Sequence, residues 1–231
     1  MNWRDLFERA LLLLGTVVAE ASDEKYPQSL VRAYIQRHAS SIVWLAADAK
    51  VLMDAGCIAA VPLIVRGMLE SGFILAAAAN EYGFAAEKML AEIADLQKRT
   101  GSRLGKDTLL AEFEELERSL REECNFTGSP RKFTVKDVAD IAELDVHYQL
   151  EYFLYSQHTH ATFGGLLARH NDENLPAQNL RAMTHVLIVA AGYTTVLLET
   201  HTPQLNIDRA EGLIDELLIL IEGEAKNDRA A

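Results

Sequence analysis

The residues best suited to chemistry lie in two stretches that are far apart in the sequence. Tyr152, Ser156 and His160 recur at intervals of four and would share one face of a helix. Arg66 and Glu70 are also four residues apart and interrupt an otherwise apolar segment. Because an isolated charge inside an apolar helix is too costly to persist without partners, Arg66 and Glu70 must each pair, with the other or with groups from another helix. A surface salt bridge between them is the alternative, but we favour a buried polar centre in which the two stretches meet.

This polar centre does not carry the signature of a hydrolase. Ser156 and His160 have the residue types of a nucleophile and its base, but no Gly-x-Ser-x-Gly elbow or recognisable oxyanion hole accompanies them. Serine and histidine four apart in a helix more often form structural hydrogen bonds. The cluster is therefore interpreted as a network that organises the core or receives a small ligand.

A second row on the same predicted helix contains His147, Glu151 and His158, and we expect it to lie nearer the surface. A metal site is not predicted here. Residues His158 and His160 are two apart, so their side chains diverge by about 200° around a helix. No Glu-x-x-His pair of the kind found in di-iron bundles is present either. The sequence therefore predicts neither a metal nor another cofactor.

The elements that position these residues are all expected to be helices, because apolar positions repeat with a period near 3.6 and no segment alternates like a strand. The prediction is an all-α, single-domain multi-helix bundle over residues 1–231, with a polar, frayed tail from about residue 224. Two almost uncharged helices, 57–80 and 176–200, should sit centrally. The other expected helices cover residues 3–21, 27–56, 85–100, 107–125, 134–144, 145–163 and 208–223.

Local signals mark several of the predicted helix starts. Asn2 is expected to cap the first helix, and Thr134 with Asp137 three residues later resembles a capping box. Asp208 with Glu211 has the same pattern and is expected to start the last helix. These signals fix element order more firmly than element length.

Composition restricts the partners and the compartment. The formal net charge of −12 gives no strong signal for nucleic acid and opposes attraction to anionic lipid. Cys57 and Cys124 are far apart and form no metal-binding motif, which favours a reducing, cytoplasmic environment. Charges and polar residues interrupt both apolar helices, so neither is expected to span a membrane.

The two motifs together resemble a known family. Arg66-x-x-x-Glu70 inside an apolar helix, followed by Tyr152-x-x-x-Ser156-x-x-x-His160, is similar to the pattern of the bacterial all-helical family called domain of unknown function 5677. The resemblance extends over residues 30–200. It implies a helical fold in which the two motifs meet, and it brings no settled activity with it.

A more distant resemblance suggests an alternative. Helical ribonucleases and nucleotide-binding domains of bacterial defence and toxin systems carry an arginine followed, four to six residues later, by a histidine. Arg32 and His38, with five residues between them, have this spacing. In such an enzyme the arginine stabilises phosphate charge while the histidine moves a proton during attack by the 2′-hydroxyl, without a metal.

The leading hypothesis from the sequence is a non-enzymatic, cytoplasmic bacterial binding or interaction module associated with stress or defence. Its expected partner is a small molecule or another protein, and an apolar helix face is compatible with a homodimer. The alternative is a metal-independent ribonuclease that uses Arg32 and His38, or Arg66 with His160.

Overall fold

The protein is built from helices throughout the part that the structure describes, and no strand occurs there. The prediction of an all-α multi-helix fold is therefore confirmed. The structure is a computed structural model. It describes residues 2–22, 29–103, 107–153, 155–156, 174–198 and 203–228.

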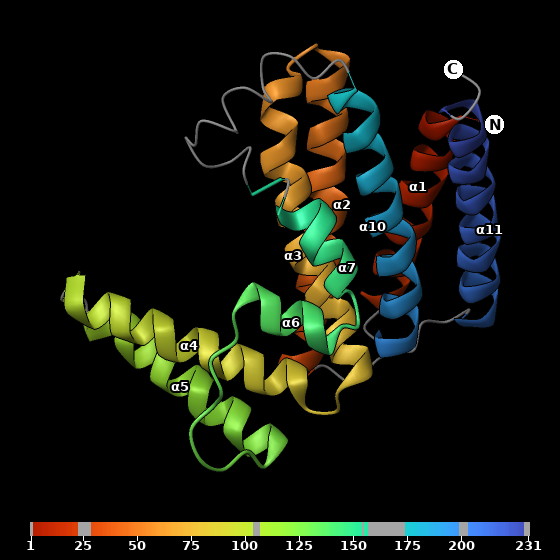
Figure 1. Ribbon diagram of the computed structural model, residues 1–231. Helices are drawn as coiled ribbons and strands as arrows, with labels where there is room; N and C mark the ends of the chain where they lie inside the picture. Colours follow the sequence, from red (N-terminus) through yellow and green to blue (C-terminus); the bar gives the residue numbers. More distant parts are fainter. Residues whose placement is uncertain are drawn as a thin grey trace.

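Five long helices form the bundle seen in Figure 1. They are α1 (Trp3–Ala21), α2 (Leu30–Asp54), α3 (Val61–Asn80), α10 (Leu175–Leu198) and α11 (Pro203–Asp228). Helix α10 packs against each of the other four, and α3 packs against both α2 and α10. The two helices that the sequence predicts to be central are thus in contact within the bundle.

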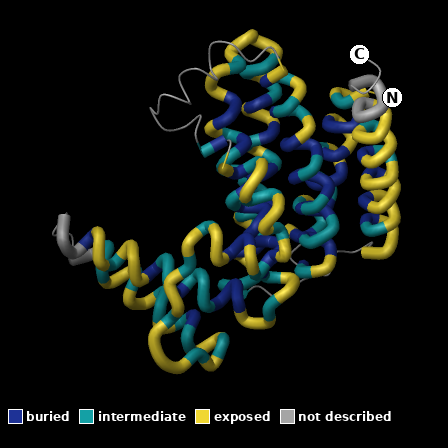
Figure 2. The backbone as a smooth tube through the Cα atoms, viewed as in Figure 1, coloured by how far each residue is buried: buried dark blue, intermediate teal, exposed yellow. Residues whose placement is uncertain are grey.

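The core of the bundle follows from the spacing of apolar side chains. Helix α1 turns one stripe inward, and Leu6, Phe7 and Leu14 on it are at most 1 % exposed. In Figure 2 the buried residues gather where α1, α3 and α10 face each other. Since helices apolar on most sides must be covered, the remaining helices pack around α3 and α10.

A hairpin of two amphipathic helices, α4 (Phe84–Arg103) and α5 (Asp107–Cys124), extends away from the bundle (Figure 1). It has a small core of its own in which Leu90, Ile93 and Leu120 are buried. Figure 2 shows fewer buried residues along this hairpin than along α3 and α10. The organisation of the whole chain as a single domain stays a prediction.

A chain of short elements leads from the hairpin back to the bundle. Helix α6 (Val135–Ile141) begins with the capping box of Thr134 and Asp137, which confirms that prediction. It is followed by α7 (Asp145–His147) and by η2 (Tyr148–Tyr152), which is a π-helix. The sequence predicts one continuous α-helix over residues 145–163, so the π-helical turn is a correction. Such turns are rare and often occur at functional sites.

Other helix ends also differ from the sequence-based expectation. Helix α2 begins at Leu30, because Ser29 caps it by accepting a hydrogen bond from the backbone of Arg32. A separate 3₁₀ turn, η1 (Ile58–Ala60), precedes α3. Helix α11 starts at Pro203, where the missing proline N–H has no cost, and it continues past residue 224 to Asp228.

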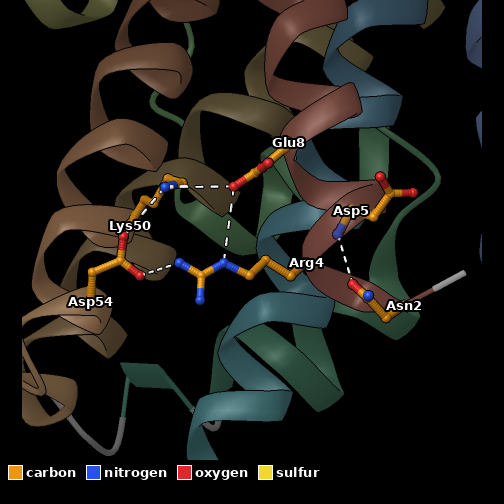
Figure 3. A network of polar contacts seen from close by, with 6 residues as sticks. All are labelled: Asn2, Arg4, Asp5, Glu8, Lys50 and Asp54. Carbon is orange, nitrogen blue, oxygen red and sulfur yellow. Dashed lines mark hydrogen bonds and ion pairs between the residues drawn. The ribbon is translucent and has the colours of Figure 1, made fainter.

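Polar contacts at one end of the bundle hold α1 to α2 (Figure 3). Asn2 caps α1 as predicted, by accepting a hydrogen bond of 2.9 Å from the backbone N–H of Asp5. Arg4 pairs with Asp54 of α2, and Lys50 lies between Asp54 at 3.3 Å and Glu8 at 3.5 Å. These exposed pairs fix the register of the two helices more than they stabilise the fold.

Two helical stretches, Ile58–Asn80 and Leu175–Leu198, are long and apolar enough to cross a membrane by length and composition alone. In the bundle they pack against each other, and 56 % of the apolar window of each is buried. Core helices of bundles have the same properties. The expectation that neither spans a membrane stays a prediction.

Candidate functional site

The sequence-predicted residues Arg66, Glu70 and Tyr152 lie in direct contact. The Tyr152 hydroxyl donates a hydrogen bond of 2.8 Å to Glu70 Oε1. Arg66 Nε donates to the same Glu70 oxygen at 3.1 Å and lies 3.2 Å from the Tyr152 hydroxyl oxygen. These three residues, the Arg66 cluster, connect α3 to the π-helical turn η2.

The aromatic ring of Tyr152 anchors this cluster in the protein. Tyr152 is 6 % exposed, and its ring lies 6.1 Å from that of Phe73 and stacks on Tyr148 at 5.2 Å. The Arg66 guanidinium sits over the same ring, 5.3 Å from its centroid. Packing on both sides fixes the position from which the hydroxyl reaches Glu70.

The charged members of the Arg66 cluster are less buried than the sequence predicts. The Arg66 side chain is 26 % exposed and that of Glu70 is 39 % exposed. The prediction of a fully buried network is therefore wrong for these two residues. Burial is predicted because the neighbouring residues in the sequence are apolar. Apolar neighbours do not ensure burial on α3, however, because Leu63 of the same helix is 64 % exposed.

The environment favours a fixed set of protonation states in the Arg66 cluster. Burial and then the nearby Glu70 carboxylate raise the pKa of Tyr152 to about 12. For Arg66, burial acts to lower the pKa, but the contacts with Tyr152 and Glu70 outweigh it and the pKa is raised. At neutral pH the tyrosine is a hydrogen-bond donor and the arginine a cation, which suits binding better than proton transfer.

The remaining two residues of the predicted polar centre are placed only in part. Ser156 is helical and half-buried. His160 lies outside the described residues, as does His158. The expected contact between the His160 row and Arg66 is therefore seen for Tyr152.

A second cluster includes Glu151, the residue that directly precedes Tyr152. His147 Nδ1 is 3.3 Å from Glu151 Oε2, and the ring centroid of His147 is 4.4 Å from that of His185 on α10. One ligand atom from each of these three residues lies within 4.8 Å of the others. We call these residues the His147 cluster, and their types are those that hold divalent transition metals.

The His147 cluster faces α10 and is partly exposed. The side chains of His147 and Glu151 are 32 % and 29 % exposed, whereas Tyr152 of the other row is only 6 % exposed, so these two residues lie nearer the surface, as expected. The segment from residue 145 to 152 lies in the groove between α3 and α10, with Tyr152 bonded to α3 and His147 against α10. Both of its faces are therefore partly covered.

Apolar side chains complete the surroundings of the His147 cluster. Leu69 and Phe73 of α3, Leu144, and Val186 of α10 line a cavity of about 20 Å³ beside the three polar residues. Burial, followed by the proximity of His147, lowers the pKa of His185. His185 is thus neutral at physiological pH, and one of its ring nitrogens has a lone pair available for a ligand role.

The sequence gives no indication of the role of His185. It appears in the sequence as one polar residue in an uncharged helical run, with no spacing that relates it to His147. The only local signal was the interval of four between His147 and Glu151, which is common on helices. Recognition of the third residue requires the packing of α10 against the η2 segment.

Arg32, one residue of the alternative ribonuclease pair, binds backbone carbonyls at the ends of two helices. Its guanidinium donates to the backbone carbonyl of Leu198 at 2.7 Å and to that of Ala21 at 3.1 Å. These carbonyls belong to the last residues of α10 and α1, where acceptors lack partners within the helix and the helix dipole favours a cation. Arg32 therefore joins the ends of two helices.

His38 lies apart from Arg32 in the interface between α2 and α3. Its Nδ1 is 3.3 Å from the Ser71 hydroxyl oxygen, and its ring meets Tyr34 edge-on at 4.6 Å. Burial lowers the pKa of His38 to about 4, against a smaller opposing effect of Glu92. The histidine is neutral at physiological pH and is partly buried.

A larger cleft lies elsewhere, between α4, α5 and residues 129–133. Two pairs of its charged side chains are bonded to each other: Lys88 to Glu92 at 2.7 Å, and Arg121 to Glu117 at 2.8 Å. Charges that are already paired are less available to a ligand. We therefore place the candidate site at the Arg66 and His147 clusters.

Comparison with known proteins gives one match. The model of a protein family, described as "Family of unknown function (DUF5677)", matches residues 32–178. That range contains both motifs of the Arg66 cluster and confirms the resemblance inferred from them. No curated protein and no solved structure matches the chain.

Proposed function

The chain belongs to the family of unknown function DUF5677, and we propose that it is a non-enzymatic helical binding module whose ligand sits at the Arg66 cluster. The observation that carries this proposal is the bond network of the Tyr152 hydroxyl, Glu70 Oε1 and Arg66 Nε. It holds three polar groups in fixed positions on a partly exposed surface. Such preorganisation lowers the entropy cost of binding.

Glu70 indicates the class of ligand. Its bonds to described residues all use Oε1, and its side chain is 39 % exposed. The carboxylate therefore offers Oε2 to a small molecule that carries an ammonium or hydroxyl group. A ligand of this class would bind beside the Tyr152 ring without displacing the internal hydrogen bonds.

Thermal-shift measurements with spermidine, ethanolamine, glucose and adenosine test this assignment. We expect at least one of these amine or hydroxyl probes to raise the melting temperature of the wild type and not that of Glu70→Gln. Glu92→Gln, which changes a half-exposed glutamate of α4, is the matched control and should respond like the wild type. Failure of every probe to shift the wild type would remove the ligand assignment.

Melting temperatures measured without a probe test whether the polar centre also stabilises the core. Glu70→Gln should lower the melting temperature, because it removes the charge that pairs with Arg66, and we expect His160→Ala to lower it as well. Unchanged melting in both variants would contradict that role.

The alternative function, a metal-independent ribonuclease, has weaker support from the geometry. Arg32 is engaged by helix-end carbonyls, and His38 is partly buried and separated from it. Incubation of the purified protein with mixed RNA, beside His38→Ala and His160→Ala variants, decides the matter. Cleavage that either substitution abolishes would favour the ribonuclease, whereas no cleavage, or cleavage that neither substitution changes, would eliminate it.

We further propose a bacterial, cytoplasmic setting associated with stress or defence, and assembly as a homodimer. Cys57 and Cys124 are free thiols, which suits a reducing compartment. Exposed Leu218 and Ile219 on α11, 51 % and 64 % exposed, offer an apolar face to a second copy. Light scattering of the wild type and a Leu218→Glu variant checks the dimer, since only the wild type should have twice the mass of the chain.

A further inference from the structure

We propose that His147, Glu151 and His185 form a binding site for one divalent transition-metal ion of the Zn²⁺ class. This inference goes beyond the proposed function and stands independently of it, because it uses none of the three residues of the Arg66 cluster. The argument rests on the types of the three side chains, their separation and the cavity beside them.

The distances are close to those of a metal centre. Zinc holds imidazole nitrogen and carboxylate oxygen at about 2.0–2.2 Å, so ligands around a tetrahedral ion lie about 3.3 Å apart. The His147 and Glu151 atoms are 3.3 Å apart, and all three ligand atoms fall within 4.8 Å. Rotation of the half-exposed His147 and Glu151 side chains would close the remaining gap without movement of α10.

The arrangement of the ligands is typical of sites inside helix bundles. His147 and Glu151, four residues apart, face one direction from a single segment, and His185 faces them from a different helix. The π-helical turn η2 begins directly after His147 and contains Glu151. It thereby sets the relative direction of the two side chains, which fits the frequent occurrence of such turns at functional sites.

The cavity has room for a single ion. Its volume of about 20 Å³ exceeds the ~10–15 Å³ that one water molecule needs, and apolar side chains form its other walls. Imidazole nitrogens and a carboxylate oxygen are ligand types that such a cation takes. Two nitrogen ligands and one oxygen favour Zn²⁺ or Fe²⁺ over Mg²⁺ and Ca²⁺, which prefer oxygen alone.

Three protein ligands leave a coordination position open. Structural zinc sites usually have four protein ligands, whereas sites with three also bind water or a small molecule. The metal would therefore be exchangeable and would also tie the η2 segment to α10. Because the ion binds the folded state, Zn²⁺ should raise the melting temperature of the protein.

Calorimetric titration of chelator-treated, dialysed full-length protein with ZnCl₂ at neutral pH measures this binding. We expect one Zn²⁺ per chain, and replacement by Co²⁺ should give the visible absorption of a low-symmetry site. His147→Gln and Glu151→Gln should each weaken Zn²⁺ binding at least tenfold. Both residues are half-exposed, so these variants should fold, which the helical circular dichroism signal verifies.

Two controls separate this site from the other histidines of the chain. Asp145→Asn changes a carboxylate on the same segment and should leave the Zn²⁺ affinity unchanged. The double variant His158→Gln, His160→Gln should likewise retain one Zn²⁺ per chain. The proposal is overturned if the wild type does not bind Zn²⁺, if His147→Gln and Glu151→Gln bind it like the wild type, or if the His158, His160 variant alone loses it.

Discussion

Two helices of the bundle each carry an arginine and, a few residues later in the sequence, a group that can bind a proton, yet the two arginines have different roles. Arg32 donates to the final carbonyls of α1 and α10, and His38 lies apart from it, partly buried between α2 and α3. Arg66, by contrast, bonds to the side chains of Glu70 and Tyr152 at a partly exposed position.

The difference shows that the bonding partners of a polar side chain indicate its role better than its residue type does. A guanidinium that satisfies helix-end carbonyls is committed to the fold, because its removal leaves buried acceptors without partners. A cluster of side chains that remains partly exposed keeps groups for an external ligand. The Arg32 region should therefore respond mainly in stability, and the Arg66 region mainly in binding.

The largest expected effect concerns the acid sensitivity caused by His38. Its pKa is about 4 in the folded protein and about 6.5 when unfolded, so the unfolded state binds the proton more readily. The folded state therefore loses no stability through His38 above pH 6.5. As the pH falls from 6.5 toward 4, the unfolded state gains a proton at His38 that the folded state does not bind, and the free energy of unfolding decreases. We expect a loss of about 2 kcal/mol by pH 5 and about 3 kcal/mol at lower pH.

Urea unfolding at pH 7 and pH 5 measures this effect. Because carboxylates and His185 titrate as well, the quantity of interest is the difference between the wild type and His38→Gln. The variant should lose about 2 kcal/mol less than the wild type between the two pH values. An identical loss in both proteins would contradict the partly buried, neutral state of His38.

The next effect is that of Arg32→Ala. The substitution removes both hydrogen bonds to helix-end carbonyls and the favourable charge near two helix C-termini. We expect the free energy of unfolding to fall by about 2–3 kcal/mol, as for buried bonds that involve a charged donor. Arg37→Ala, at an exposed position of the same helix, is the control, and urea unfolding should show a change below about 0.5 kcal/mol.

A smaller effect is expected for Tyr152→Phe in the other region. The ring and its packing remain, while the hydroxyl that connects Glu70 and Arg66 is lost. Stability should fall by about 1–2 kcal/mol in urea unfolding, the range for one hydroxyl with a charged partner. Tyr148→Phe offers a matched control, because this ring stacks on Tyr152 and no hydrogen bond involves its hydroxyl among the described residues. Equal losses in both variants would show that the Tyr152 bonds contribute nothing.

The same contrast explains how much could be predicted from the sequence. The periodicity of apolar residues predicts the helices, and the cost of an isolated charge predicts that Arg66 and Glu70 find a partner such as Tyr152. The partial exposure of one face of α3 could not be predicted from the sequence. Apolar residues such as Leu63 also lie on that face, so no polar stripe marks it. The π-helical turn and the approach of His185 depend on tertiary packing, which leaves no period in the sequence.

The smallest expected stability effect is that of Glu70→Gln, and it distinguishes the two regions most directly. The Arg66–Glu70 pair is partly exposed, so solvent screens its attraction. Glutamine can still accept the Tyr152 hydrogen bond, and we expect a loss of only about 0.5–1 kcal/mol in urea unfolding. A loss as large as that of Arg32→Ala would mean that the Arg66 cluster is also committed to the fold. A small loss of stability combined with a lost response to amine or hydroxyl probes would separate binding from folding at this position.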